Sequence, residues 1–502
     1  MAKICLCLTG KTIARNLEIL EKYKKYVDIA ELRVDCLDPN ERFHIRSFPE
    51  RAGIPVIITV RRVGDGGKYS GHEGARITLL SRGLAFANPN PRKNFAYVDL
   101  EEDLRVPSLE EAARAFGTRI IRSYHNLNGV DKNLAQKLQS LRWVGDEIAK
   151  TVVMPRSLDE VRLAYKAARE TAGTEKILLC MGDYGVNTRI LAEVMGSVLS
   201  YTTVKGEEGI PIGASGQLDP RELGELYRFR EITQKTKIYA VSGFPLQVTA
   251  SPQFFNTVFS IENEDAVYVP VPSDSIESFL KLSDEIGIRG ASITVPHKET
   301  VLQYLASRSE AVASIGACNT IVAGPRGWHG YNTDSPGFSD SLLYFSKLKD
   351  LKRKKITIIG AGGVARAVAS EIYRLKGKAL ILNRTVARAR EIALPYHFAW
   401  GGLDTHGFTM MEKFADIIIQ STSVGMEPDT EEDPLRFYKF SGREIVIDLV
   451  YKPEKTHCLL RAEAEGCKIL NGYDMLLRQA RYQYRYFMEK EFPASLINRV
   501  GF

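Results

Sequence analysis

Two side chains in the first third of the chain are suited to carbonyl chemistry. Lys150 lies within an apolar stretch, EIAKTVVM, and His125 follows another apolar stretch in SYH. If Lys150 is in a strand packed on both faces, its ammonium loses hydration, which favours the neutral, nucleophilic amine. His125 would be a general acid or base. The alternatives are a lysine paired with a buried carboxylate such as Glu31, and a histidine satisfied within the core.

A second candidate pair lies in the C-terminal half. Lys298 follows a strand-like stretch and a proline turn, and Asp334 lies in the glycine-bounded segment GYNTDSPG. A lysine and an aspartate brought together could deliver a proton to a carbonyl group that is being reduced. Their spacing does not show that they meet, and surface positions are the alternative.

A glycine cluster follows the apolar, β-branched stretch Ile356–Ile359. A helix-period segment, Ala365–Leu375, and a second strand, Lys378–Asn383, come after it. Strand, glycine turn, helix and strand in this order predict a dinucleotide site, with the pyrophosphate at the helix N-terminus. The residues expected at the cofactor are Gly360, Ala361, Gly362, Gly363, Val364 and Ala365.

The end of the second strand indicates which cofactor binds. NAD sites usually carry an acidic residue there, whereas this chain has Asn383-Arg384-Thr385, with Arg388 close behind. Two guanidinium groups could bind a phosphate on the ribose, which favours NADP over NAD. The alternative is a solvated basic start of a helix.

The first 230 residues alternate between strand-like and helix-like stretches. Eight such units predict a (β/α)8 barrel, and a doubly wound open sheet is the alternative. The expected strands are Ile4–Leu8, Ile29–Val34, Val56–Val60, Ala96–Leu100, Arg119–Tyr124, Ile148–Met154, Ile177–Met181 and Tyr201–Val204. Expected helices include Ile77–Ala87, Leu109–Phe116, Leu158–Thr171 and Arg189–Leu199. Polar residues at the strand ends, where barrels place their chemistry, are Glu31, Arg33, Arg61, His125 and Arg189.

Composition fits a multidomain globular protein. The 502 residues are 44% hydrophobic and 26% charged, and the net charge of +7 is spread along the chain, which suits small anionic ligands and does not demand nucleic acid. The seven cysteines lack CxxC spacing, so we expect neither disulfides nor a metal site. No signal-peptide core or membrane span is evident, and we expect a cytoplasmic protein.

The barrel residues carry a family resemblance. Over roughly residues 1–228, the chain resembles the type I 3-dehydroquinate dehydratases in ELRVD, SYHN, Lys150, MGDYGVNTR and ASGQ. The resemblance implies a Schiff base on Lys150, proton transfer by His125, and a substrate carboxylate held by Arg189. Glu31, Arg33, Arg61 and Gln217 would line the pocket. The sequence departs from the family at Asp65, where a glutamate is usual, and at Gly213, a frequent serine position near Ser215.

Residues 237–502 resemble shikimate dehydrogenase through SGFP, TASPQF, GASITVPHKE, GACNTIV and GYNTDSPG. The resemblance implies that Lys298 and Asp334 are the catalytic pair. Substrate ligands would be Thr249, Ser251, Thr294, Asn319, Tyr451 and Gln479, with Val248-Thr249 replacing the usual His-Ser. Thr422, Ser423, Val424 and Gly472 would adjoin the cofactor. The helix around Tyr473–Phe487 should fold back onto the substrate domain.

Together the two resemblances imply a bifunctional enzyme of the shikimate pathway: a lyase converting 3-dehydroquinate to 3-dehydroshikimate, and an NADP-dependent oxidoreductase forming shikimate. Expected domains are the barrel at 1–230, the substrate-binding domain at 237–340, the Rossmann domain at 341–472 and a C-terminal helical segment at 473–502. An NAD-linked quinate oxidoreductase is disfavoured by Arg384 and Arg388. A non-enzymatic sensor is disfavoured by Lys150, His125, Lys298 and Asp334.

Overall fold

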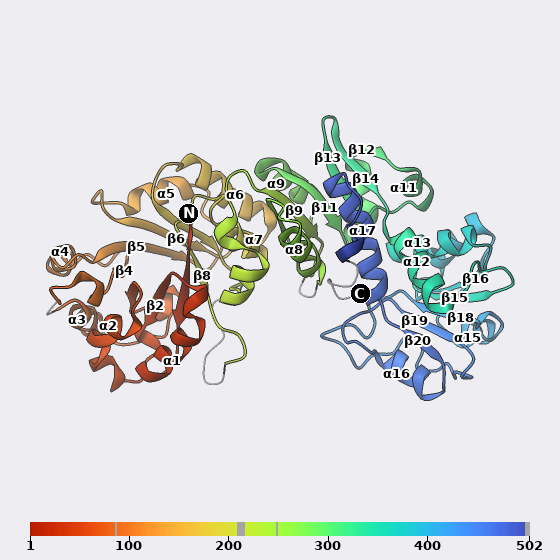
Figure 1. The fold of residues 1–502 in the computed structure, drawn as a ribbon, viewed down its shortest axis with the longest axis horizontal. Coiled ribbons are helices and arrows are strands. Elements are labelled where there is room, and N and C mark those ends of the chain that lie inside the picture. The colour runs from red at the N-terminus through yellow and green to blue at the C-terminus, as the bar shows by residue number, and fades with distance from the viewer. Residues whose placement is uncertain (86–87, 208–215, 247–248, 497–502) are drawn as a thin grey trace. The chain divides into compact units, whose positions relative to one another are not determined.

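The computed structural model describes residues 1–85, 88–207, 216–246 and 249–496, and its N-terminal part is a barrel (Figure 1). Eight strands follow the order β7-β6-β5-β4-β3-β2-β1-β8, and an isolated parallel bridge between Lys176 and Ser197 joins the ends. The strands are β1 Lys3–Leu8, β2 Ile29–Arg33, β3 Val56–Thr59, β4 Tyr97–Glu101, β5 Arg119–Asn126, β6 Ile148–Val153, β7 Lys176–Cys180 and β8 Leu199–Thr202. The predicted (β/α)8 barrel is confirmed.

Seven helices alternate with these strands. They are α1 Ile13–Tyr23, α2 Phe48–Ala52, α3 Glu73–Leu84, α4 Pro107–Ala115, α5 Leu134–Leu141, α6 Leu158–Glu170 and α7 Val186–Ile190. The helix predicted for Arg189–Leu199 is wrong. The chain leaves the helix after Ile190, turns through Gly196 at φ +63°, and enters β8 at Leu199. The apolar spacing there reflects a buried turn, not a helical face.

A second sheet has the order β10-β9-β11-β13-β14-β12. Its strands are β9 Lys237–Ser242, β10 Ala266–Pro270, β11 Ile288–Ile293, β12 Leu305–Arg308, β13 Thr320–Gly324 and β14 Gly327–Tyr331. The helices of this part are α8 Ser251–Ile261, α9 Ile276–Ile286, α10 His297–Thr300, α11 Glu310–Ile315 and α12 Asp334–Ser346.

The third sheet is fully parallel, in the order β17-β16-β15-β18-β19-β20. The chain order reverses at β15, as in dinucleotide-binding folds, so the carboxyl ends of β15 and β18 flank the expected site. The strands are β15 Lys355–Ile359, β16 Lys378–Leu382, β17 Ala399–Gly401, β18 Ile417–Gln420, β19 Ile445–Asp448 and β20 Lys468–Leu470. The predicted Rossmann unit is confirmed.

Helices cover both faces of this sheet because its strands are apolar on both sides. Ile356 and Ile358 pack on one face with residues of α12, α13, α14 and α17, whereas Ile359 and Ile418 pack on the other with residues of α15 and α16. The helices are α13 Gly363–Arg374, α14 Val386–Ala393, α15 Thr405–Met411, α16 His457–Ala464 and α17 Tyr473–Met488.

The last long helix returns to the substrate-binding sheet. The Tyr239 hydroxyl on β9 donates to the backbone carbonyl of Phe487 on α17, at 2.8 Å. A Cβ at Gly337 of α12 would lie 2.8 Å from the backbone nitrogen of Gln479 on α17, so the two helices are in close backbone contact. Helix α17 therefore packs against the sheet that contains β9 and against α12.

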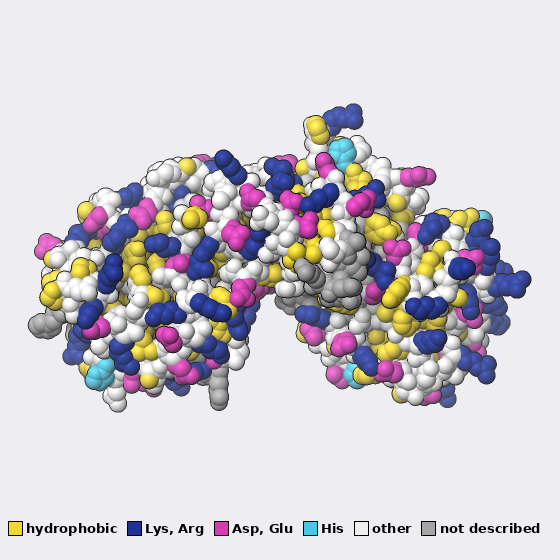
Figure 2. Space-filling view, viewed as in Figure 1, with side chains coloured by type: hydrophobic (Ala, Val, Ile, Leu, Met, Phe, Trp, Pro, Cys, Tyr) yellow, Lys and Arg dark blue, Asp and Glu magenta, His cyan; other side chains and the backbone are white. Residues whose placement is uncertain are grey.

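Two compact units result: Met1–Ile238 with Phe259–Ile286, and Tyr239–Val258 with Gly287–Phe502. Basic and acidic side chains are interspersed over the visible face (Figure 2), as the dispersed charges of the sequence predict. Within the described ranges, no helix is long and apolar enough to cross a membrane.

A buried carboxyl group closes one strand of the third sheet. Asp448 ends β19 and is fully buried, with Oδ2 accepting from the Thr456 hydroxyl at 2.6 Å and Oδ1 accepting from the Val450 amide at 3.0 Å. Burial raises the pKa of Asp448 to about 7, although these two hydrogen bonds oppose the shift. The native state therefore holds a proton at this site that the unfolded chain releases near pH 4.

We expect this group to make the folded protein less stable as pH rises from about 4 to about 7, by roughly 4 kcal/mol for a shift of about three units. Asp448→Asn cannot ionise, so it should flatten the pH dependence of the thermal midpoint between pH 5 and pH 8. Asp429→Asn, at an exposed carboxylate, should leave that dependence unchanged. An Asp448→Asn profile parallel to that of the unmodified protein would contradict the assignment.

Candidate functional site

The barrel buries a lysine that has carboxylate partners. Every residue of β6 is buried, and Lys150 lies at its centre. Its Nζ is 2.8 Å from Asp99 Oδ2 and 3.9 Å from Glu31 Oε1, and it lies 4.4 Å from the centre of the Tyr201 ring. The pairing anticipated for a buried lysine is therefore present, but its closest carboxylate is Asp99 and not Glu31.

Sequence reasoning missed Asp99 and Glu101, which lie on β4. Arg61 donates from Nη2 to Asp99 Oδ1 and from Nη1 to Glu101 Oε1, both at 2.8 Å. Although burial alone would raise it, the pKa of Asp99 is held well below its usual range by the positive charges of Arg61 and Lys150. The sequence did contain a signal for these two residues. Asp99 and Glu101 are two positions apart in the apolar stretch YVDLE, and alternate positions of a barrel strand face the interior of the barrel.

His125, near the end of β5, is suited to accept a proton. Its Nδ1 is buried without a hydrogen-bond partner among the described residues. Burial, reinforced by the positive charges of Arg61 and Lys150, lowers the pKa of His125 well below its usual value. The imidazole is therefore neutral at physiological pH and has a free acceptor or donor atom inside the barrel.

Three other predicted residues lie around this group. Glu31 accepts from the Thr59 hydroxyl at 2.9 Å and from the Cys7 thiol at 3.2 Å. Gln217 Nε2 also lies near Cys7 Sγ, at 3.6 Å, while its Oε1 is buried without a partner among the described residues. Arg33 is paired with Asp35 at 2.7 Å.

Arg189 is a buried guanidinium. Its Nε has no partner, and it forms no ion pair within the described part of the chain. Burial lowers the pKa of Arg189 to about 10. A buried, uncompensated cation is costly, so this position favours an anionic ligand such as a carboxylate.

One predicted barrel residue, Asp65, has its carboxylate bound by a neighbouring arginine. Asp65 accepts from Arg62 Nε at 2.7 Å, and Arg62 also pairs with Asp103 at 2.8 Å. Ser215 lies outside the described residues, as do Gly213 and Val248.

The second predicted pair meets. Lys298, on α10, places Nζ 2.6 Å from Oδ2 of Asp334, the first residue of α12, and both side chains are about nine-tenths buried. Asn319 Nδ2 donates to the other carboxylate oxygen, Asp334 Oδ1, at 2.9 Å. The carboxylate is thus fixed from both sides, and the lysine is left with donors that can reach a ligand.

Residues of α17 complete this site. Asn319 Nδ2 lies 3.3 Å from Gln479 Oε1, which also accepts from the Thr333 hydroxyl at 3.1 Å. One helical turn on, Gln483 Nε2 donates to Asn319 O at 3.3 Å and to Thr320 Oγ1 at 3.0 Å. Sequence reasoning missed Thr333 and Gln483, although the spacing of Gln479 and Gln483 puts both on one helix face.

The remaining predicted substrate residues come from loops, a strand end and the start of α8. The Tyr451 hydroxyl interacts with the Thr249 side chain and the Ala250 backbone, and burial raises the pKa of Tyr451. The Ser251 amide donates to Thr249 Oγ1 at 3.3 Å. Thr294 follows β11, with its backbone amide bonded to Ser242 O at 2.9 Å. The structure joins Tyr451, Thr249 and Ser251 in one group.

The glycine turn has the shape that a dinucleotide needs. Gly360 has φ +112°, and a Cβ there would lie 2.8 Å from Ser421 Oγ and 2.9 Å from Thr422 Cγ2. A Cβ at Gly362 would have open space within 4 Å. Gly363 begins α13, and its Cβ position is 3.1 Å from the Lys298 side chain. The helix N-terminus therefore adjoins the Lys298–Asp334 pair.

The other predicted cofactor residues differ in exposure. Ala361 and Ala365 are buried in the core and Val364 packs against it, so only their backbone could serve a ligand. Val424 N donates to Thr422 Oγ1 at 3.2 Å, and Ser423 is exposed. Gly472 caps α17 and donates to Val450 O at 3.1 Å.

The end of β16 presents free basic groups. Asn383 Nδ2 donates to Thr385 O at 3.0 Å. Arg384 and Arg388 are exposed and form no ion pair with the described residues. Both guanidinium groups are therefore available to an anionic ligand.

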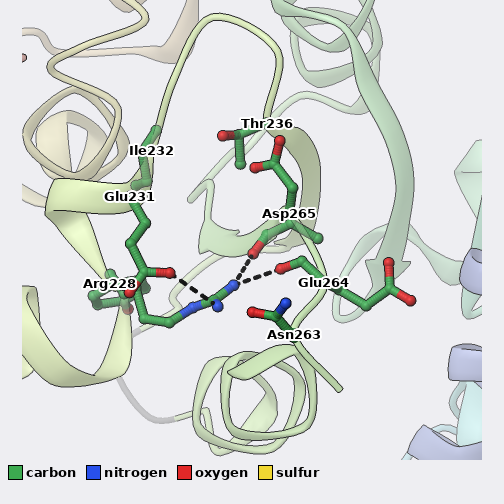
Figure 3. Close-up of a pocket in the computed structure, with 9 residues that line it drawn as sticks. Arg228, Glu231, Ile232, Thr236, Asn263, Glu264 and Asp265 are labelled. Atoms are coloured by element: carbon green, nitrogen blue, oxygen red, sulfur yellow. Dashed lines mark hydrogen bonds and ion pairs between the residues drawn. The ribbon is translucent and has the colours of Figure 1, made fainter. Parts of the chain in front are cut away.

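A separate pocket adjoins the segment 227–236 (Figure 3). Arg228 donates from Nη2 to the carbonyl oxygens of Glu264 and Ala266 at 2.6 and 3.3 Å, and pairs with Glu231 at 3.1 Å. None of the predicted site residues lines it.

Family models match most of the chain. The type I 3-dehydroquinase model matches residues 4–234, the shikimate dehydrogenase substrate binding domain matches 241–321, and the shikimate/quinate 5-dehydrogenase model matches 343–448. These matches agree with the two resemblances found in the sequence.

Known proteins resemble either the whole chain or its C-terminal half. The chloroplastic bifunctional 3-dehydroquinate dehydratase/shikimate dehydrogenase of Arabidopsis thaliana is 28% identical over 98% of this chain and 83% of its own length. The NADP(+) shikimate dehydrogenase of Moorella thermoacetica is 36% identical over 54% of this chain and 94% of its own. The solved dehydroquinate dehydratase and shikimate dehydrogenase from S. pombe is 21% identical, covers 99% of this chain and 98% of its own, and has a TM-score of 0.43. The chain therefore belongs to the shikimate dehydrogenase family through its C-terminal half, which follows a type I 3-dehydroquinase domain in the same polypeptide.

Proposed function

We propose that this chain is a bifunctional enzyme that dehydrates 3-dehydroquinate to 3-dehydroshikimate in its barrel and reduces that product to shikimate with NADPH in its second half. The observation that carries the proposal is the presence of two separate buried lysines, each in contact with a carboxylate. Lys150 lies beside a neutral histidine, and Lys298 lies beside the N-terminus of a dinucleotide-binding helix.

In the barrel, Lys150 Nζ bonds to the ketone carbon of the substrate, and water leaves as the imine forms. The cationic imine withdraws electrons, so the C2–H bond can break with its proton passing to His125. Those electrons form the new double bond and expel the C1 hydroxyl, which leaves as water with the proton from His125. A water molecule then hydrolyses the imine and returns the lysine.

Binding roles follow from charge and burial. Arg189 holds the substrate carboxylate, because it is a buried cation without an ion pair in the described chain. Glu31, Arg33, Arg61 and Gln217 line the pocket. Asp65 is bound to Arg62, and we assign it no substrate contact.

In the second half, the residues present fit NADP. Gly360 allows close backbone approach, the space beside Gly362 is open at the start of α13, and the two free guanidinium groups at the end of β16 suit a ribose phosphate. When bound, the reduced nicotinamide supplies a hydride. Thr422, Ser423, Val424 and Gly472 would line its pocket.

The chain's own residues supply the proton and the orientation. Lys298 gives a proton to the carbonyl oxygen as it becomes a hydroxyl, and Asp334 holds the ammonium in place. Thr249 and Ser251 hold the substrate carboxylate, and Thr294, Asn319, Tyr451 and Gln479 bind ring hydroxyls. Small carboxylates are thus the partners that the two sites require, and neither site calls for nucleic acid.

The predicted domain boundaries at 230/237, 340/341 and 472/473 and a cytoplasmic location form part of this proposal. All seven cysteines are free thiols.

Single substitutions should separate the two activities in the full chain. Lys150→Ala should lower dehydratase kcat by about two to four decades or more, because removal of a catalytic proton-transfer or nucleophilic group usually costs that much. Reductase kcat should stay within about twofold. Lys298→Ala should do the reverse. Spectrophotometric assays of each half-reaction measure both rates.

Lys176→Met is the matched control for Lys150. Lys176 is also a buried barrel lysine, but it donates to Thr171 O at 3.0 Å and lies outside the proposed site. Dehydratase activity that survives Lys150→Ala, or that falls equally with Lys176→Met, would refute the assignment.

Arg384→Ala should weaken NADP binding by about 1.5–3 kcal/mol, one to two decades in KM, because one charge-assisted contact is lost. NAD turnover should change little. Arg390→Ala, at an exposed position of α14, the helix that follows Arg384, should affect neither cofactor. Equal use of NADP and NAD by the unmodified protein would exclude this role.

A further inference from the structure

We propose that Asp99 positions Lys150 and balances its positive charge during the dehydratase reaction, an inference that rests on the function proposed for the barrel. Asp99 Oδ2 lies 2.8 Å from Lys150 Nζ. Its other oxygen, Oδ1, accepts from the Ser123 hydroxyl at 2.6 Å and from Arg61 Nη2 at 2.8 Å. The side chain is fully buried, so both oxygens are occupied by protein donors and the carboxylate has little freedom to move.

A series of buried charges holds Asp99 itself. Arg76 on α3 donates to Glu101 Oε2 at 2.6 Å, and Glu101 Oε1 accepts from Arg61, which donates in turn to Asp99. Charges of opposite sign thus alternate from α3 to Lys150. Because each member has at least two partners, the position of the last carboxylate is fixed before any substrate binds.

The groups that face Lys150 come from five strands and the segment after β3. They are Asp99, Glu31, Arg61, His125, Tyr201, Cys5 and Cys7. Among the carboxylates of the described residues, only Asp99 is within hydrogen-bond distance of Nζ, since Glu31 is at 3.9 Å. Asp99 therefore decides the direction in which the amine points.

The carboxylate has a role at two stages of the reaction. Before the imine forms, it stabilises the ammonium and so opposes loss of the proton. Once the imine has formed, the nitrogen keeps one N–H and a positive charge, and the same carboxylate stabilises that cation at the stage when the C2 proton leaves. Asp99 does not itself take the proton, because the surrounding cations keep it ionised. The acceptor is the His125 imidazole, whose Nδ1 has no hydrogen-bond partner among the described residues.

Asp99→Asn in the full chain tests this role, since the amide keeps the shape and removes the charge. Maximal dehydratase kcat should fall at least about 100-fold. Without the anion the neutral amine forms more easily, so the acidic limb of the pH profile of kcat/KM should move to lower pH by about one unit or more. Circular dichroism and the thermal midpoint of the variant check that its barrel has folded, because the reductase site lies in the other compact unit.

Two further variants separate a charge role from a structural one. Ser123→Ala removes one hydrogen bond to Asp99 and keeps its charge, so the acidic limb should stay in place. Asp99→Glu keeps the negative charge but moves it, so kcat should fall while the acidic limb stays in place. This variant also tests the positioning role if Asp99→Asn does not fold. The proposal would be overturned if Asp99→Asn and Ser123→Ala lost dehydratase kcat equally and the acidic limb of the kcat/KM profile stayed in place in both. It would also be overturned if Asp99→Asn kept a kcat within twofold of the unmodified protein.

Borohydride trapping distinguishes this inference from the function beneath it. With 3-dehydroquinate, the unmodified protein should gain a ligand-derived mass on the peptide that contains Lys150. If it does, and Asp99→Asn has an unchanged profile, the role of Asp99 is wrong and the dehydratase function stands. If the unmodified protein is not labelled on Lys150, the Schiff-base function itself fails, and the role of Asp99 fails with it.

Discussion

Both candidate sites depend on burying a lysine ammonium beside a carboxylate. An unpaired ammonium inside a protein loses far more hydration energy than folding can offset, so it must have a partner or give up its proton. Lys150 meets Asp99 at 2.8 Å, and Lys298 meets Asp334 at 2.6 Å. The two pairs lie on unrelated elements, a barrel strand and a short helix after a proline turn. The shared constraint yields different chemistry because the neighbours differ: a neutral histidine in one site and a glycine-rich helix start in the other.

The sequence predicted a site residue or an element where the evidence for it lay in one short stretch of the chain. Lys150 was found because a lysine inside a continuous apolar strand is conspicuous, and the barrel was found because eight strand–helix units recur. Asp99 was missed because YVDLE alternates like any half-exposed strand, and only closure of the barrel shows that its acids face Arg61 and Lys150. The helix predicted for Arg189–Leu199 failed for a related reason: apolar residues in a buried turn can match helical spacing by chance.

The second site shows the same limit over longer separations. Lys298 and Asp334 are 36 residues apart, and no spacing rule could place them together. The contact arises because β13, which begins just after Asn319, pairs with both β11 and β14, and this brings the starts of α10 and α12 to one end of the sheet. The α17 helix then adds Gln479 from 160 residues away. The family resemblance predicted these residues but did not predict Gln483. Its hydrogen bonds to Asn319 and Thr320 join α17 to the same group of hydrogen-bonded side chains.

In the cofactor region, some predicted residues matter for the shape of the backbone and others for their side chains. At the glycine turn, backbone shape matters most: Gly360 and Gly363 are required by close neighbours, whereas Ala361 and Ala365 serve the core. At the end of β16, the identity of exposed side chains matters, and this can be read directly from Asn383-Arg384-Thr385. Because Gly363 packs against the Lys298 side chain, the helix that receives the pyrophosphate and the lysine that delivers the proton are held in one packed unit. A larger residue at position 363 would therefore disturb cofactor binding and the catalytic pair together, which neither motif shows on its own.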